Sequence, residues 1–286
     1  MSNKAPIRAV LPDAEHIEQA YLFELLRERL SQDLPMQELL TDIRHELLTT
    51  TKLPLAIEFL ATELRHSGLM SPAMQRLTHY FTPFQTYIVS QAEEEVGRFT
   101  MDSALAVLHG EAKFRTDERS SAQGMFFYHF EVLSRNRLNY DRGLTAVSED
   151  PVYDVPWKKW LLTLRAQLGL VDLADLIFLA SDEYQKRLLS SGEDPSDRGP
   201  FLFGVREGRI AFGNRGREPL FLFAAMQRHL GYPAVPRIEK KGDDSDLIPQ
   251  MARRIERLES RIKLLEEERR GGIDITQFYE KFKEQQ

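Results

Sequence analysis

The stretch IPQMARRIERLESRIKLLEEERR, residues 248–270, carries the strongest periodic pattern in the chain. Its apolar residues recur at alternating steps of three and four, which is the a/d pattern of a coiled coil. They are Ile248, Met251, Ile255, Leu258, Ile262 and Leu265. Isoleucine at a with leucine at d favours two parallel helices. The segment therefore predicts a coiled-coil helix that joins two copies of the chain.

The charged residues beside this seam agree with a parallel dimer. Arg254 and Arg261 fall at g positions, and Glu259 and Glu266 fall at e positions. Each g residue of a parallel dimer faces the e residue five positions later on the partner, so both pairs are opposite in charge. The seam spans only about 27 Å, and isolated helices of this length are marginal. Because the helix is this short, two alternatives to a dimer stay open. The seam could dock on this chain's own helices or on a helix of another protein.

Composition places the rest of the chain among ordinary globular proteins. Of 286 residues, 42% are hydrophobic and 29% are charged. The net charge of −6 argues against a protein that coats nucleic acid or an anionic membrane as a whole. The absence of cysteine excludes disulfides, thiolate metal sites and cysteine nucleophiles. No signal peptide or membrane-spanning stretch is recognisable, which predicts a cytoplasmic protein without a membrane partner.

Residues 10–190 predict a helical domain, built as an antiparallel array or bundle with short connections. Apolar stripes and capping residues mark the expected helices. These run over about 13–31, 36–49, 53–67, from 71 to the region of Pro83, 84–97, 101–113, 157–168 and 172–189. The aromatic run at 125–138 fits either a helix or a strand. The fold class expected is therefore mainly α.

A small basic module is expected over 200–238, after a linker rich in Gly, Pro and Ser. Two short apolar runs, 201–205 and 209–212, surround a glycine-containing turn and predict a β-hairpin. A helix from about Pro219 to Leu230 follows. The segment from Arg198 to Lys241 contains nine basic residues and only three acidic ones.

This basic module suggests an anionic partner. The candidate contacts are Arg206, Arg209, Arg215 and Arg217. Arginine interleaved with phenylalanine is typical of platforms for single-stranded nucleic acid. A packed phenylalanine face with a solvated arginine rim explains the same pattern without any partner.

The C-terminal part divides into the coiled coil at 246–271 and an amphipathic tail at 272–286. Gly271 and Gly272 end the helix. The tail carries Phe278, Tyr279 and Phe282 between charged residues. This spacing is typical of a helix that anchors in a groove of another protein, although the tail could equally fold back on its own chain.

Motifs that carry chemistry are absent from the sequence, so no catalytic residue, metal or cofactor is expected. There is no nucleophile elbow, no phosphate-binding loop and no H-E-x-x-H. Asp42 with His45, and Glu63 with His66, have the spacing of metal ligands but lie off the apolar stripes, which predicts that they face solvent. His129 is expected to be partly buried and bonded to backbone. The group His109, Gly110 and Glu111 at a helix end has no evident partner.

The leading hypothesis is a non-enzymatic homodimeric scaffold or adaptor with protein-binding surfaces. One alternative is a nucleic-acid-associated regulator that uses the basic segment 198–241. Another is a helical metal-dependent or hydrolytic enzyme of unrecognised type. A cluster of inward-facing carboxylates and histidines would favour that enzyme.

Overall fold

The computed structural model describes residues 11–30, 35–94, 98–195 and 198–236. These ranges contain thirteen helices and two isolated β-bridges, so the prediction of a mainly α-helical protein is confirmed. The helices are α1 (Asp13–Leu30), α2 (Met36–Ile43), α3 (Leu53–Ser67), α4 (Ser71–Arg76), α5 (Pro83–Glu93), α6 (Met101–Arg115), α7 (Ala122–Arg135), α8 (Tyr140–Ser148), α9 (Val155–Gln167), α10 (Leu173–Leu179), α11 (Asp182–Ser191), α12 (Val205–Gly213) and α13 (Pro219–Leu230). The predicted coiled coil and tail, 246–286, lie outside the described residues.

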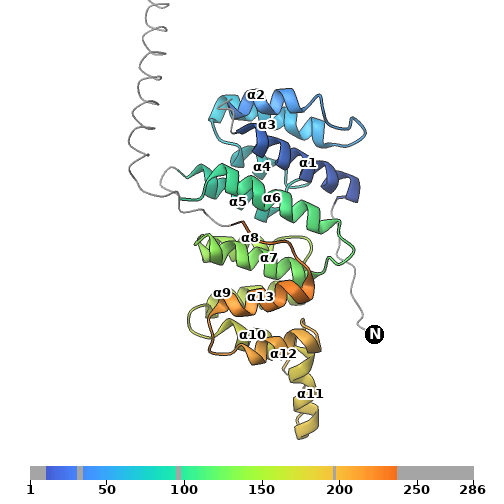
Figure 1. Ribbon diagram of the computed structural model, residues 1–286, viewed down its shortest axis with the longest axis vertical. Helices are drawn as coiled ribbons and strands as arrows, with labels where there is room; N and C mark the ends of the chain where they lie inside the picture. Colours follow the sequence, from blue (N-terminus) through green and yellow to red (C-terminus); the bar gives the residue numbers. More distant parts are fainter. Residues whose placement is uncertain (1–10, 31–34, 95–97, 196–197, 237–286) are drawn as a thin grey trace, which may run out of the picture. The chain divides into compact units, whose positions relative to one another are not determined.

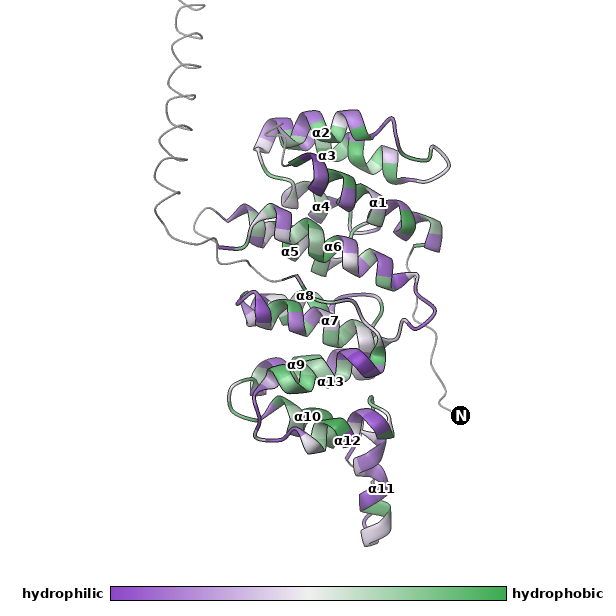
Figure 2. Ribbon diagram, viewed as in Figure 1, coloured by the Kyte–Doolittle hydropathy of each residue, from purple (hydrophilic) through white to green (hydrophobic). Residues whose placement is uncertain are grey.

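The helices stack in two rows (Figure 1). One row runs from α2 through α1, α6, α7 and α13 to α12. The other runs through α3, α4, α5, α8 and α9. Contacts of α5 with α6 and of α7 with α8 join the rows, and one apolar core runs between them (Figure 2). None of the described helices combines the length and the apolar character needed to cross a bilayer.

Capping residues place several helix ends where the sequence predicts them. Asp172 accepts a hydrogen bond from the start of α10, and Gly231 ends α13 in the left-handed conformation, with φ of 73°. Pro83 begins α5, whereas the helix expected from 71 to the region of Pro83 already ends at Arg76. Thr82 and Gln85 form a capping box there, which satisfies two amide groups that a helix start otherwise leaves without partners.

The aromatic run at 125–138 is helical as far as Arg135 and belongs to the central helix α7. Ten consecutive residues, 124–133, are buried. A helix that is buried on every side shows no amphipathic period, which is why its sequence alone does not distinguish helix from strand. α7 touches α6, α8 and α13, so it forms the middle of the array.

The predicted β-hairpin is wrong, because residues 205–213 form helix α12. The glycine assigned to the turn, Gly208, lies inside this helix. A Cβ atom there would approach the Ser181 Oγ to 2.3 Å. Gly208 is therefore explained by the close packing of α12 against the start of α11, and not by a turn.

The single helix expected at 172–189 is also wrong, because it divides into α10 and α11. Phe203 explains the break: its amide donates to the Ala180 carbonyl at 3.0 Å, and its carbonyl accepts from the Asp182 amide at 2.8 Å. The Phe203 ring lies among Trp157 and Trp160, with ring centroids 5.2 and 5.1 Å away. Leu202 and Phe203 therefore share the core of the helical array.

Candidate functional site

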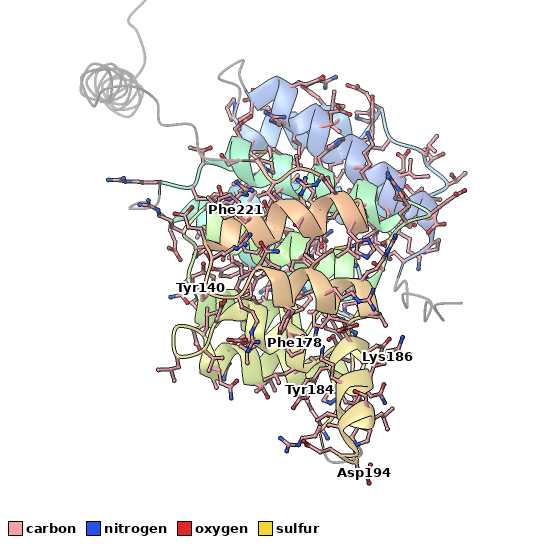
Figure 3. All side chains as sticks on the ribbon, turned by 60° about the horizontal axis from the view of Figure 1, so that its bottom comes forward. Tyr140, Phe178, Tyr184, Lys186, Asp194 and Phe221 are labelled. Carbon is pink, nitrogen blue, oxygen red and sulfur yellow. The ribbon has the colours of Figure 1, made fainter. Side chains whose placement is uncertain are left out.

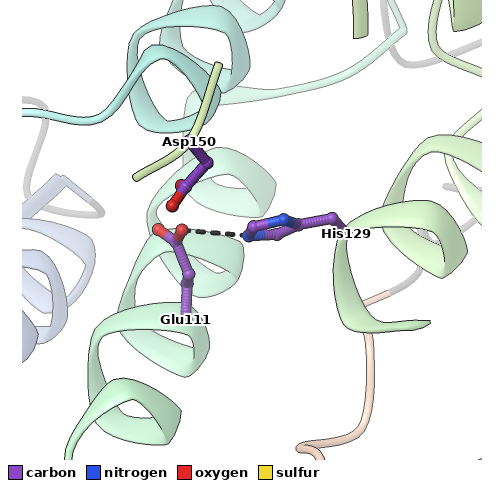
Figure 4. Close-up of side chains that lie close together, drawn as sticks. All are labelled: Glu111, His129 and Asp150. Carbon is purple, nitrogen blue, oxygen red and sulfur yellow. Dashed lines mark hydrogen bonds and ion pairs between the residues drawn. The ribbon is translucent and has the colours of Figure 1, made fainter. Parts of the chain in front are cut away.

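A cluster of charged side chains is buried at the centre of the array (Figure 4). Glu111 and Arg115 lie one turn apart on α6, His129 comes from α7, and Asp150 follows α8. Glu111, His129 and Asp150 are each 0% exposed. Charged side chains are almost never fully buried unless they are paired, so each of these groups must find its partner inside the protein.

Arg115 connects the two carboxylates of this ionic cluster. Its Nη2 donates to the Glu111 Oε1 and to the Asp150 Oδ2, both at 2.6 Å. The Glu111 Oε1 also lies 3.0 Å from the His129 Nε2. Asp150 is held further by the Val152 amide, which donates to its Oδ1 at 3.0 Å. Each carboxylate thus has a cationic or N–H partner supplied by the chain itself.

Two aromatic residues fix the imidazole of His129. The Tyr153 hydroxyl lies 3.2 Å from its Nδ1. The Phe84 ring stacks on the imidazole with ring centroids 3.9 Å apart. Burial raises the pKa of Tyr153 well above its usual value, so this hydroxyl keeps its proton. The ring is therefore held on both edges and on one face.

The pKa values in the ionic cluster follow from burial and from the paired charges. Burial alone would raise the pKa of Glu111, but the charge of Arg115 and the hydrogen bond from His129 outweigh it and lower that pKa to about 2. Burial would likewise lower the pKa of Arg115, whereas Asp150 and Glu111 together raise it. Glu111 and Arg115 are therefore both ionised at neutral pH.

The ionic cluster offers a metal-like set of ligands, because Glu111, His129 and Asp150 place ligand atoms within 4.8 Å of one another. Two carboxylates and an imidazole would suit a divalent metal. Arg115 argues against one, since its Nη2 already lies 2.6 Å from one oxygen of each carboxylate and its positive charge compensates theirs. We therefore interpret these residues as an ionic network in which Arg115 takes the place of a metal.

The pairing in this ionic cluster is not complete. The Glu111 Oε2 and the Arg115 Nε are buried and have no hydrogen-bond partner in the described part of the chain. Such an atom costs about 1–3 kcal/mol. Apart from these two atoms, the ion pairs of the cluster join α6 to α7 and to the residues after α8, which is the arrangement of a network that supports the fold.

Sequence reasoning missed this ionic cluster. His129 is fully buried, and its ring contacts the Glu111 and Tyr153 side chains, so the expectation of a partly buried histidine bonded to backbone is wrong. The one available signal was Glu111 four residues before Arg115, a spacing that places an ion pair on one helix face. The solvent-facing prediction for Asp42, His45 and His66 is confirmed, since all three are exposed.

The four arginines predicted to meet an anionic partner do not form one surface of free charges. Arg209 donates to Glu183 at 3.0 Å, and Arg215 pairs with Asp175. The guanidinium carbon of Arg215 also lies 5.1 Å from the centre of the Phe212 ring. Arg206 and Arg217 are exposed and have no ion pair among the described residues. Two of the four predicted arginines are therefore neutralised by acidic side chains of the protein itself.

Comparisons with known proteins do not add a relative: no family model, no curated protein and no solved structure matches the chain.

Proposed function

We propose that the protein is a non-enzymatic homodimeric scaffold or adaptor. In this proposal two copies join through a parallel coiled coil at 248–265, and each helical array presents surfaces for other proteins. The observation that carries the proposal is the heptad pattern, with its apolar a and d positions and oppositely charged g and e positions.

The helical array supports this proposal in two ways. The described residues, 11–236 with their gaps, belong to one compact unit, so assembly through a later segment would not require this unit to rearrange. Its surface also carries large apolar side chains that the fold leaves exposed. Leu55 is 70% exposed, and Phe221 is 59% exposed at the start of α13 (Figure 3). Exposed apolar side chains of this size suit contacts with other proteins when they gather into patches.

The tail at 272–286 belongs to the same proposal. Phe278, Tyr279 and Phe282 would provide an aromatic anchor for a groove on a partner protein. Because the tail follows the coiled coil directly, a dimer would display two such anchors. Two linked anchors bind a partner with two grooves far more tightly than one does, because the second contact is intramolecular.

A charge exchange at the g and e positions tests the proposed dimer. One variant carries Arg254→Glu and Arg261→Glu, and the other carries Glu259→Arg and Glu266→Arg. Each variant alone would place like charges across the seam and should dissociate at a concentration at least tenfold higher than the wild type. An equimolar mixture should form a heterodimer, because every facing pair is then again opposite in charge.

Native mass spectrometry of the two variants, one of them isotope-labelled, measures this outcome. A mixed dimer that exceeds both homodimers is the expected result. Two variants that each dimerise like the wild type, or a mixture that stays monomeric, would contradict the parallel coiled coil.

A further inference from the structure

A second feature, distinct from the ionic cluster, is a hollow of about 790 Å³ between elements far apart in the sequence. The connection from α6 to α7 lines it, together with the starts of α11 and α12 and the end of α13. Three basic side chains gather on its walls: Arg119, Lys186 and Arg206. We refer to this feature as the basic hollow. Its volume lies within the range of about 300–1,000 Å³ that holds small molecules.

The positive charges of the basic hollow are available to a ligand. Lys186, near the start of α11 (Figure 3), and Arg206, on α12, form no ion pair within the described ranges. Arg119 pairs with Asp117 at 3.2 Å, but its side chain is 69% exposed. Because solvent screens an exposed ion pair of this kind, Arg119 can leave Asp117 and turn toward an anion.

The basic hollow also holds acceptors for hydroxyl groups. Asp182, Gln185 and Glu207 line it beside the cations. Glu207 is fixed in place, because its Oε1 lies 2.9 Å from the His229 Nε2. Gly204 leaves room for this carboxylate, since a Cβ atom there would approach the Glu207 Oε2 to 2.6 Å. Cations and hydroxyl acceptors therefore share one concave site.

We propose that the basic hollow binds a small phosphorylated sugar, such as the ribose phosphate part of a nucleotide. Guanidinium groups match the geometry of phosphate oxygens and donate charge-assisted hydrogen bonds to them. Carboxylates in the same site accept hydrogen bonds from sugar hydroxyls. A simple dianion would use only the cations, whereas a phosphorylated sugar uses both kinds of group.

Calorimetric titration of the full chain tests this site with three probes: ribose 5-phosphate, ribose and inorganic phosphate. Ribose 5-phosphate should bind at least tenfold more tightly than either of the other two, and its affinity should fall as salt rises. Lys186→Glu with Arg206→Glu should weaken this binding at least tenfold. Asp182→Asn should reduce the preference for ribose 5-phosphate over inorganic phosphate.

Lys158→Glu with Lys159→Glu is the matched control, because it changes the net charge equally at exposed residues outside the basic hollow. This control should bind ribose 5-phosphate like the wild type. Equal weakening in the control, no binding of ribose 5-phosphate at millimolar concentration, or equal affinity for ribose 5-phosphate and inorganic phosphate would overturn the proposal. Dimer formation is measured separately, so failure of this site leaves the scaffold proposal untouched, and the reverse also holds.

Discussion

Replacing Arg115 with methionine should destabilise the protein by about 3–5 kcal/mol. Methionine fills much of the space of the arginine stem but removes the charge that both Glu111 and Asp150 contact at 2.6 Å. Two buried carboxylates would then lie close together without a cation. Urea unfolding of the full chain, followed by circular dichroism, measures the change in the free energy of unfolding.

A triple variant separates the lost charge from the lost packing. Arg115→Met combined with Glu111→Gln and Asp150→Asn removes all three formal charges and should recover part of the lost stability. If Arg115→Met alone changed the free energy of unfolding by less than 1 kcal/mol, the ionic cluster would not support the fold as we describe. A triple variant no more stable than the single one would show that charge compensation is not the reason.

The second large effect is expected at Phe203. Replacement by alanine should cost about 3–5 kcal/mol, because this ring is 1% exposed and its loss leaves a cavity. The surrounding rings include Phe126 and Phe127, at centroid distances of 5.9 and 6.1 Å. Gln123 adds a hydrogen bond to the neighbouring Leu202 carbonyl at 2.6 Å. The free energy of unfolding from urea titration is again the measurement.

Phe221→Ala provides the matched control, because the same side chain is exposed there and its removal should change stability by no more than about 0.5 kcal/mol. The cost at Phe203 should appear in the unfolding of the whole array, since residues 201–203 pack on α7 and pair with the chain between α10 and α11. Separate unfolding of residues 200–236, with the rest of the array unaffected, would contradict this shared core.

Local signals in the sequence predict most of the helices. Asp13, Pro54 and Gly231 stand at the start or end of helices that the structure confirms, because capping and φ preferences act within a few residues. α8 is not among the expected helices, although Asn139 caps its start and its buried residues, which include Leu144 and Val147, lie on one face. α12 was mistaken for a hairpin because Phe201 and Phe203 resemble strand residues, and Phe203 does make an isolated bridge with Ser181. The conformation of residues 201–213 depends on contacts that Gly208 and Phe203 make with residues distant in the sequence.

The ionic cluster and the basic hollow could not be predicted in the same way. Glu111, His129 and Asp150 are spread over 40 positions, and no motif fixes their spacing. Their meeting depends on how α6, α7 and the end of α8 pack. The basic hollow similarly gathers Arg119, Lys186 and Arg206 from three segments, while Arg209 and Arg215 turn to Glu183 and Asp175. The number of basic residues in the sequence indicates a basic segment. It does not indicate which of their side chains remain without an acidic partner in the fold.

The absolute mass of the full chain in solution, measured by light scattering at micromolar concentration, tests the proposed assembly most directly. We expect twice the chain mass of 33.1 kDa. Ile255→Asp with Leu258→Asp should reduce it to the mass of one chain, because both new charges fall on the seam. Gln250→Asp with Ser260→Asp, at c and f positions, should leave the dimer intact. A wild-type protein with the mass of a single chain, or a seam variant that remains dimeric, would contradict the coiled-coil scaffold.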